Sequence, residues 1–206
     1  MKDAQAEPAY GRVDWRRFAV AVGVPTVVAG GMLFGIANGA FAASFAVSGQ
    51  DFKISADRLE GDGFAQYGGV VKDAEGREIP VALSGIKRAT LVNLCQSVRV
   101  KDAPMSLTIT AGTENGKPAK ATDLLIGVKD LAGDATFTNI NIGQDAGTLT
   151  LGGAEARGDT GGFGQQADDV TITGLRQTAV STTAGTFTLT GLQLKLNFGS
   201  RPKECF

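Results

Sequence analysis

Side chains that could carry acid–base or nucleophilic chemistry are few in this chain. None of its 206 residues is histidine, the most frequent general base of enzymes and a common metal ligand. No Gly-x-Ser-x-Gly sequence is present, and a Ser-His-Asp arrangement cannot be built within the chain. Ser84-Gly-Ile-Lys87 has the Ser-x-x-Lys spacing of a serine/lysine dyad. That spacing needs a helix, whereas residues 79–84 are typical of a strand and turn, so we expect no dyad and no enzyme.

A small acidic cluster offers the carboxylate oxygens that calcium prefers. It consists of Asp57, Glu60 and Asp62, which lack the number and spacing of the ligands of a calcium loop, so a solvated turn is the favoured interpretation. No glycine-rich phosphate loop precedes a helical pattern. No run of Lys or Arg after Arg17 is dense enough to follow a phosphate backbone. We therefore expect no metal, no cofactor and no nucleic acid as ligand.

Two cysteines are present, Cys95 in a strand-like run and Cys205 next to the C-terminus. An oxidising compartment favours their pairing, and two free or intermolecular thiols are the alternative. A disulfide between them would tie the C-terminus to the core. It would stabilise the folded chain by on the order of 4 kcal/mol, because it closes a long loop.

An uncharged stretch from Phe18 to Val47 precedes these residues, and it is longer than the roughly 20 residues that a transmembrane helix needs. Arg16 and Arg17 stand directly before it, which places residues 1–17 in the cytoplasm and residues 48–206 on the far side. A signal peptide is the alternative, and it would yield a secreted chain. The small residues that a signal peptidase reads, and the first residue of the cleaved chain, would be Ala40, Ala42 and Ala43.

Three glycines recur four residues apart within this stretch, on one face of a helix: Gly31, Gly35 and Gly39. Small residues at that spacing let a second membrane helix approach closely. They predict a homo-oligomer or a membrane-protein partner. The alternative is the general abundance of glycine in spans and in this chain.

Residues 48–206 are predicted to form a single extracytoplasmic all-β domain, either a β-sandwich or a β-groove. The alternation of apolar and polar residues is clearest from Met105 to Ala111, and it recurs at residues 52–56, 124–128 and 149–151. The glycine-rich run 152–168 is predicted to be a surface loop. The apolar phase changes across Gly174 and Gly191, which predicts bulges or bends there.

Beyond Gly191, apolar residues occupy the even positions Leu192, Leu194, Leu196 and Phe198. Strands with one apolar face can curve into a groove that shields an acyl chain, and this series would line its wall. Filling an ordinary core is the more usual role of such residues, and it is the outcome we expect.

Several runs are similar to a known family: Gly39-Ala-Phe-Ala-Ala-Ser-Phe45, Val47-Ser-Gly-Gln50, Gly63-Phe-Ala-Gln-Tyr-Gly-Gly69, Asn93-Leu-Cys-Gln-Ser97 and the Cys205 terminus. Together they resemble an uncharacterised family of actinobacterial membrane-anchored proteins often labelled cholesterol esterase. The resemblance extends from Trp15 to Phe206. It implies an actinobacterial cell envelope and, by analogy, a small multi-span membrane protein as partner. The esterase label lacks support from the residues, because the chain offers neither the base nor the nucleophile elbow.

These features predict a non-catalytic protein of the cell envelope, with one N-terminal transmembrane helix and a β-domain that assembles with itself or with a membrane protein. A lipid-binding or lipid-carrying module is the second hypothesis. A sterol or lipid esterase is the third, and the absence of histidine disfavours it.

Overall fold

The computed structural model describes residues 48–101, 103–113, 117–153 and 156–206. Among them, no helix is long and apolar enough to cross a bilayer. Several sequence predictions fall outside the described residues: the span 18–47, its glycine face Gly31, Gly35 and Gly39, and the cleavage site Ala40, Ala42 and Ala43.

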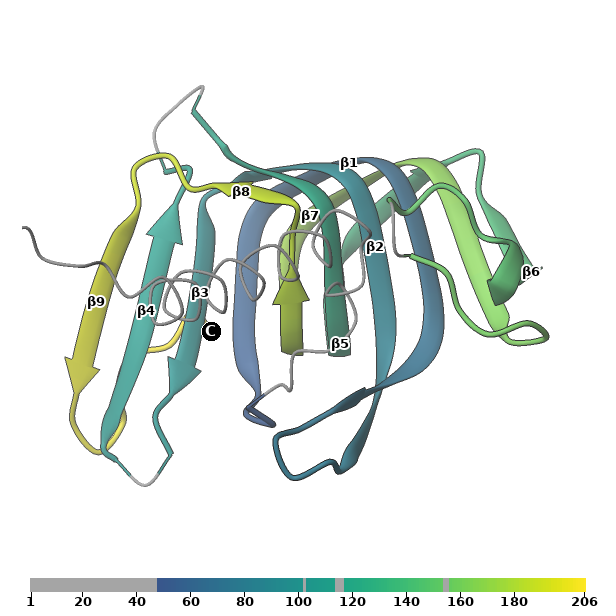
Figure 1. Ribbon diagram of the computed structural model, residues 1–206. Helices are drawn as coiled ribbons and strands as arrows, with labels where there is room; N and C mark the ends of the chain where they lie inside the picture. The colour runs from purple at the N-terminus through teal and green to yellow at the C-terminus, as the bar shows by residue number, and fades with distance from the viewer. Residues whose placement is uncertain (1–47, 102, 114–116, 154–155) are drawn as a thin grey trace, which may run out of the picture. The chain divides into compact units, whose positions relative to one another are not determined.

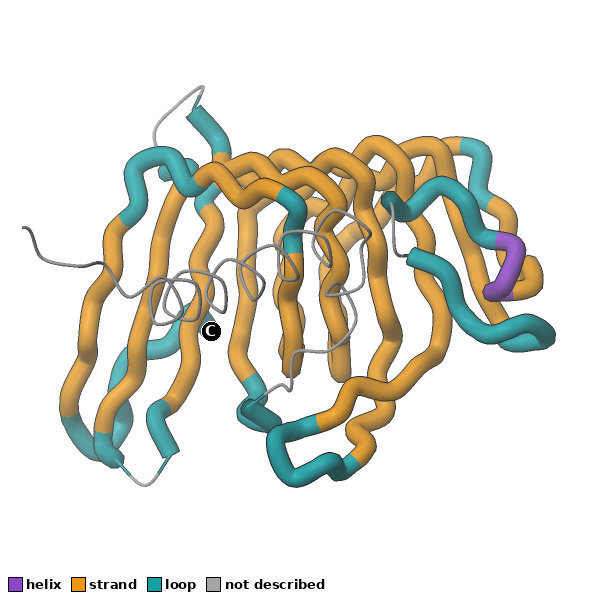
Figure 2. Tube along the Cα trace, viewed as in Figure 1, coloured by secondary structure: helices purple, strands orange, loops and turns teal. Residues whose placement is uncertain are grey.

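The described residues form an all-β domain, as the sequence predicts (Figure 2). Its strands are β1 (Phe52–Lys72), β2 (Glu78–Val92), β3 (Leu94–Arg99), β4 (Met105–Ala111), β5 (Ala119–Thr138), β6 (Asn141–Asp145), β7 (Phe163–Thr183), β8 (Thr186–Thr188) and β9 (Gln193–Phe198), with one short 3-10 helix, η1 (Ala146–Thr148). All pairings are antiparallel. The strands belong to one nine-stranded sheet rather than to the two separate sheets of a sandwich.

The sheet closes on itself in a part that we call the ring, made of β1, β2, β5 and β7. β1 pairs with β2 along one edge and with β7 along the other, and β5 pairs with both β2 and β7. The interior of the ring is filled by buried apolar side chains. A Cβ at Gly61 would lie 2.8 Å from methyl groups of both Ile86 and Val170. The ring is therefore a packed core, not a binding cavity.

Three strands continue the sheet beyond the ring, in the order β3, β4, β9, and we call them the flap (Figure 1). β3 prolongs β2, because the register along β1 is unbroken from Arg58 opposite Val92 to Ser55 opposite Cys95. Asn93, between the two strands, has a φ of 53°.

The boundary between ring and flap is a line of three residues in the left-handed region. Asn93, Gly112 and Gly191 have φ values of 53°, 65° and 68°. Backbone hydrogen bonds join this line: Asn93 N donates to Gly112 O at 2.9 Å, and Gly112 N donates to Thr190 O at 2.8 Å. Gly191 is thus the bend that the sequence predicts. Gly174 lies in a bulge, with a φ of 63° beside a register shift between β5 and β7.

The segment after η1 corrects two predictions. Leu149 to Leu151 is not a strand, because Leu149 follows η1 and is buried on the outer side of the ring with Ala65 and Tyr67. The predicted loop 152–168 is too long. Its last residues, from Phe163, already belong to β7 and pair with β1 and β6, although they are poor in apolar side chains. The strand predicted from Met105 to Ala111 is β4, with the same bounds.

Candidate functional site

The most unusual surface of the domain is one side of the flap, which we call the apolar face. It consists of Val98, Met105, Leu107, Ile109, Leu194, Leu196 and Phe198. Cross-strand pairing puts them in rows, with Met105 opposite Phe198, Leu107 opposite Leu196, and Ile109 opposite Leu194. The three side chains of β9 keep 62% (Leu194), 47% (Leu196) and 74% (Phe198) of their surface exposed.

This exposure corrects the expectation that the even-numbered series from Leu192 to Phe198 fills an ordinary core. Leu192, at the turn before β9, is also exposed, at 54%. Burying one Leu or Phe side chain stabilises a protein by about 1.5–3 kcal/mol. A row of such side chains in water therefore forgoes stability, which makes this face a candidate interaction surface.

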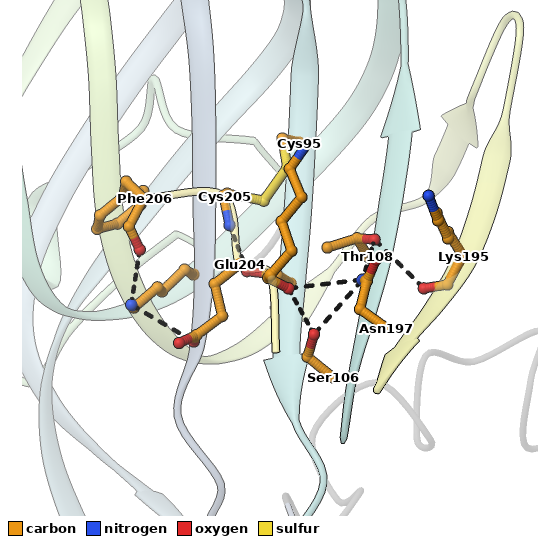
Figure 3. Close-up of a disulfide and its surroundings, with 11 residues drawn as sticks. Cys95, Ser106, Thr108, Lys195, Asn197, Glu204, Cys205 and Phe206 are labelled. Atoms are coloured by element: carbon orange, nitrogen blue, oxygen red, sulfur yellow. Dashed lines mark hydrogen bonds and ion pairs between the residues drawn. A yellow bond between two sulfur atoms is a disulfide. The ribbon is translucent and has the colours of Figure 1, made fainter. Parts of the chain in front are cut away.

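The opposite side of the flap is polar and is crossed by the C-terminal strap, residues 199–206 (Figure 3). Ser106 Oγ donates to Lys203 O at 2.5 Å, and the backbone N of Cys205 donates to Ser97 Oγ at 3.0 Å. Asn197 Nδ2 donates to Thr108 Oγ1 at 2.9 Å. These contacts pair polar side chains of β3, β4 and β9 with one another and with the strap, so the strap covers part of this face.

A disulfide fastens the strap. Cys95 and Cys205 are bonded, as the sequence predicts, with Cα atoms 5.8 Å apart and a sequence separation of 110. The chain then ends against the ring. Lys53 Nζ donates to Phe206 O at 2.7 Å and lies 3.4 Å from Glu204 Oε1. The strap thus connects flap and ring on the polar side only.

A small cavity of about 20 Å³ lies where the ring interior meets the flap. Its lining is mostly apolar, but Gln177 Nε2 and Thr182 Oγ1 are buried there with no hydrogen-bond partner in the described part of the chain. A cavity needs about 10–15 Å³ to hold one water molecule. This one suits a single water or one small polar group, and it is too small for a lipid or a cofactor.

The structure does not bring together the residues of the dyad pattern. Ser84 and Lys87 both lie in β2, where an odd separation puts their side chains on opposite sides of the strand. Ser84 is buried and its hydroxyl accepts a hydrogen bond from Gln66 Nε2 at 2.8 Å, whereas Lys87 is exposed. Gln165 Nε2 continues this row by donating to Gln66 Oε1 at 2.7 Å. Ser84 belongs to a structural hydrogen-bond row across β2, β1 and β7.

The acidic cluster is dispersed along β1. Asp57 accepts a hydrogen bond from the side-chain amide of Asn93, Glu60 pairs with Arg58 at 2.7 Å, and Asp62 pairs with Arg88 at 2.5 Å. Within the described ranges, no group of three or more His, Cys, Asp or Glu side chains is placed to hold a metal ion.

A shallow depression of about 570 Å³ on the outer side of the ring is the other candidate surface. It spans β1, β2, β5 and β7, and charges of both signs line it. Opposite charges already neutralise one another there, as in the Asp62–Arg88 pair. Mixed, solvated pairs of this kind point to no particular ligand.

Comparison with known proteins places the chain in a family. No curated protein and no solved structure matches it. A model of a family of unknown function (DUF6230) matches residues 48–206, the whole of the β-domain described above. The chain therefore belongs to this family of unknown function (DUF6230).

Proposed function

We propose that this chain is a non-catalytic protein of the cell envelope, held at a membrane by residues 18–47, whose β-domain binds lipid acyl chains on the apolar face of the flap. The exposure of Leu194, Leu196 and Phe198, in register with apolar residues of β4, carries the proposal. Acyl chains have no polar groups. They suit this face because its side chains neither donate nor accept hydrogen bonds, and the backbone groups of β4 are already paired with β3 and β9. The resemblance to actinobacterial membrane-anchored proteins supports the location.

An esterase finds less support. The hydroxyl of Ser84 is buried in a hydrogen-bond row, and Lys87 lies on the other side of β2. A nucleophile needs an adjacent base to be activated. The esterase label of the similar family therefore points to no catalytic step that Ser84 and Lys87 would perform.

Photolabelling tests the proposal. The full chain is purified in a mild detergent with a phospholipid that carries a diazirine in its acyl chain, irradiated, and digested for mass spectrometry. We expect adducts on peptides of β4 and β9. Replacing Leu194 and Leu196 with Ser should lower this labelling about tenfold or more, because two apolar contacts are lost.

Ile142→Ser is the matched control, because Ile142 is 67% exposed on β6, away from the flap. It should leave the labelling of β4 and β9 unchanged. Adducts that spread evenly over the exposed apolar residues, or that fall only within residues 18–47, would contradict lipid binding by the flap.

A second candidate is assembly with another copy or with a membrane protein, and one observation favours it. In the described part of the chain, β9 pairs with β4 alone, so its outer edge offers backbone donors and acceptors to another strand. Crosslinks between copies that map to β9, together with absent lipid adducts, would establish assembly instead.

A further inference from the structure

Basic side chains gather at one end of the flap, which we call the tip. Lys101 lies in the turn between β3 and β4, and Arg201 and Lys203 follow β9 in the strap; all three are exposed. Gly199 N donates to Pro104 O at 2.9 Å, which holds the end of β9 beside the β3–β4 turn. The two basic segments are therefore neighbours in space.

The basic side chains of the tip are unpaired as far as the described residues go. None of these three side chains forms an ion pair with another described residue, whereas nearby Arg99 is paired with Glu204 at 3.4 Å. The flap and strap, residues 94–111 and 193–206, contain five Lys or Arg and two Asp or Glu, while the whole chain has 20 and 21. The positive charge is thus local to this end of the molecule.

The tip adjoins the most exposed part of the apolar face. Phe198, 74% exposed, is the last residue of β9 and lies opposite Met105, the first residue of β4. Basic side chains next to an exposed aromatic ring and leucines are the combination that binds the interface of a bilayer, because the ring enters the acyl boundary and the cations attract anionic lipid.

The start of the domain lies at the same end of the flap. Phe52, the first residue of β1, pairs with Val98, one residue before the end of β3. The uncharged stretch ends at Val47, and the five residues from there to Phe52 span at most about 18 Å when extended. A connection this short limits how far the start of β1 can lie from the end of the uncharged stretch.

We infer that the tip of the flap docks on a bilayer surface that contains anionic lipid. Phe198 and Leu196 contact the acyl region, and Lys101, Arg201 and Lys203 contact the phosphates of the headgroups. This inference rests on the proposed function and adds to it the class of lipid and the orientation of the domain. Charge complementarity and the short connection to Val47 select the membrane over a soluble partner.

Fluorescence quenching in lipid nanodiscs tests the inference with the full chain. Trp15→Phe removes the single tryptophan, and Phe198→Trp then places one reporter at the tip. The discs hold acyl-brominated phosphatidylcholine, with or without phosphatidylglycerol. We expect strong quenching in discs with phosphatidylglycerol, weaker quenching without it, and a loss of the difference at high salt.

One test variant and two matched controls sharpen the test. A reporter at Phe163, 64% exposed at the start of β7, should stay unquenched in both discs. Lys101→Gln with Lys203→Gln should weaken docking about 30-fold, since each basic residue contributes a factor of about five. Lys87→Gln with Lys120→Gln, which removes two exposed lysines of the ring, should leave docking unchanged.

The outcomes separate the two proposals. Quenching at Phe198→Trp that is equal in both discs and insensitive to Lys101→Gln with Lys203→Gln would overturn the anionic headgroup site, while acyl contact by the flap would stand. Absence of quenching in both discs, with failed photolabelling of β9, would overturn both. A reporter signal that changes with protein concentration and not with lipid would identify a second copy as the occupant, which also overturns docking on the membrane.

Discussion

Asp73 shows how one side chain organises the turn between β1 and β2. It is only 4% exposed, and its carboxylate accepts hydrogen bonds from the backbone N of Glu75 and Arg77 and from Arg77 Nε, at 3.0, 2.8 and 2.6 Å. Burial by itself raises the pKa of this carboxyl, but the hydrogen bonds and the charge of Arg77 outweigh it. The pKa of Asp73 is therefore lowered from its ordinary value of 3.8, and the pKa of Arg77 is raised.

The lowered pKa sets the sign of a pH effect. Asp73 stabilises the fold fully above its unfolded pKa of 3.8, and this contribution is lost as the pH falls through the lower folded pKa. Asp73→Asn should lower the melting temperature at neutral pH and flatten its fall below about pH 4. Melting curves at several pH values measure both effects. Glu75→Gln, an exposed acid of the same turn, is the control, and equal effects of the two variants would refute the role of Asp73.

Gly85 is required by a close approach rather than by its backbone angles. A Cβ there would lie 2.2 Å from Ala156 Cβ and 2.5 Å from Gly152 O. Gly85→Ala should therefore destabilise the protein by about 1–3 kcal/mol and displace the segment after η1 from the ring. Urea unfolding measures the loss. Gly68→Ala, where no atom lies within 4 Å, should change stability by less than about 0.5 kcal/mol. Similar losses of stability in both variants would show that close packing around Gly85 is not what destabilises Gly85→Ala.

At the scale of the elements, the position of the strap depends on the disulfide between Cys95 and Cys205. Cys95→Ser with Cys205→Ser should lower the free energy of unfolding by about 4 kcal/mol, because the unfolded chain regains the freedom of a long loop. Protease sensitivity of residues 199–206 should rise as well, since the remaining contacts are separate hydrogen bonds, such as Cys205 N to Ser97 Oγ, and the ion pairs of Glu204 with Lys53 and Arg99. Denaturant unfolding and limited proteolysis measure the two effects. An unchanged cleavage rate would mean that the hydrogen bonds and ion pairs hold the strap without the disulfide.

The strands were predictable where a local pattern determined them. The alternation from Met105 to Ala111 predicted β4 with its bounds, and the phase change across Gly174 predicted a bulge. Short patterns failed. Two leucines, at 149 and 151, resembled a strand, but Leu149 is the C-cap of η1, which ends directly before that segment. Alternation also predicts that the even-numbered apolar residues from Leu192 to Phe198 lie on one face of a strand. It does not predict whether another element covers that face.

At the scale of the whole molecule, the closure of the ring was beyond sequence reasoning. It depends on the pairing of β1 with β7, such as Phe52 with Ala179, between residues more than a hundred positions apart. No local pattern encodes which of several similar strands meet. The tip was missed for the same reason, because its basic residues come from two segments that only the fold brings together.

Strands that are hydrogen-bonded along both edges should exchange their amide hydrogens more slowly than strands bonded along one edge. β7 is paired along both edges, whereas β9 pairs with β4 alone among the described strands. Amides of β9 should exchange much faster than those of β7 in the native full chain, because opening the flap leaves the ring intact. Peptide-resolved mass spectrometry at two protein concentrations measures this. Equal protection at both would show that another strand covers the edge of β9.

The line formed by Asn93, Gly112 and Gly191 gives the molecule a hinge. In the part of the chain that the structure describes, the connections from β2 to β3, from β4 to β5 and from β8 to β9 each contain one of these residues. Backbone hydrogen bonds from Asn93 to Gly112 and from Gly112 to Thr190 join the three connections. A change in the angle of the flap would therefore be concentrated there, with the packed ring as the fixed support. The disulfide-bonded strap connects the flap to the ring on the polar side. It therefore restrains the flap from that side and leaves the apolar face, with its leucines and Phe198, uncovered by the strap.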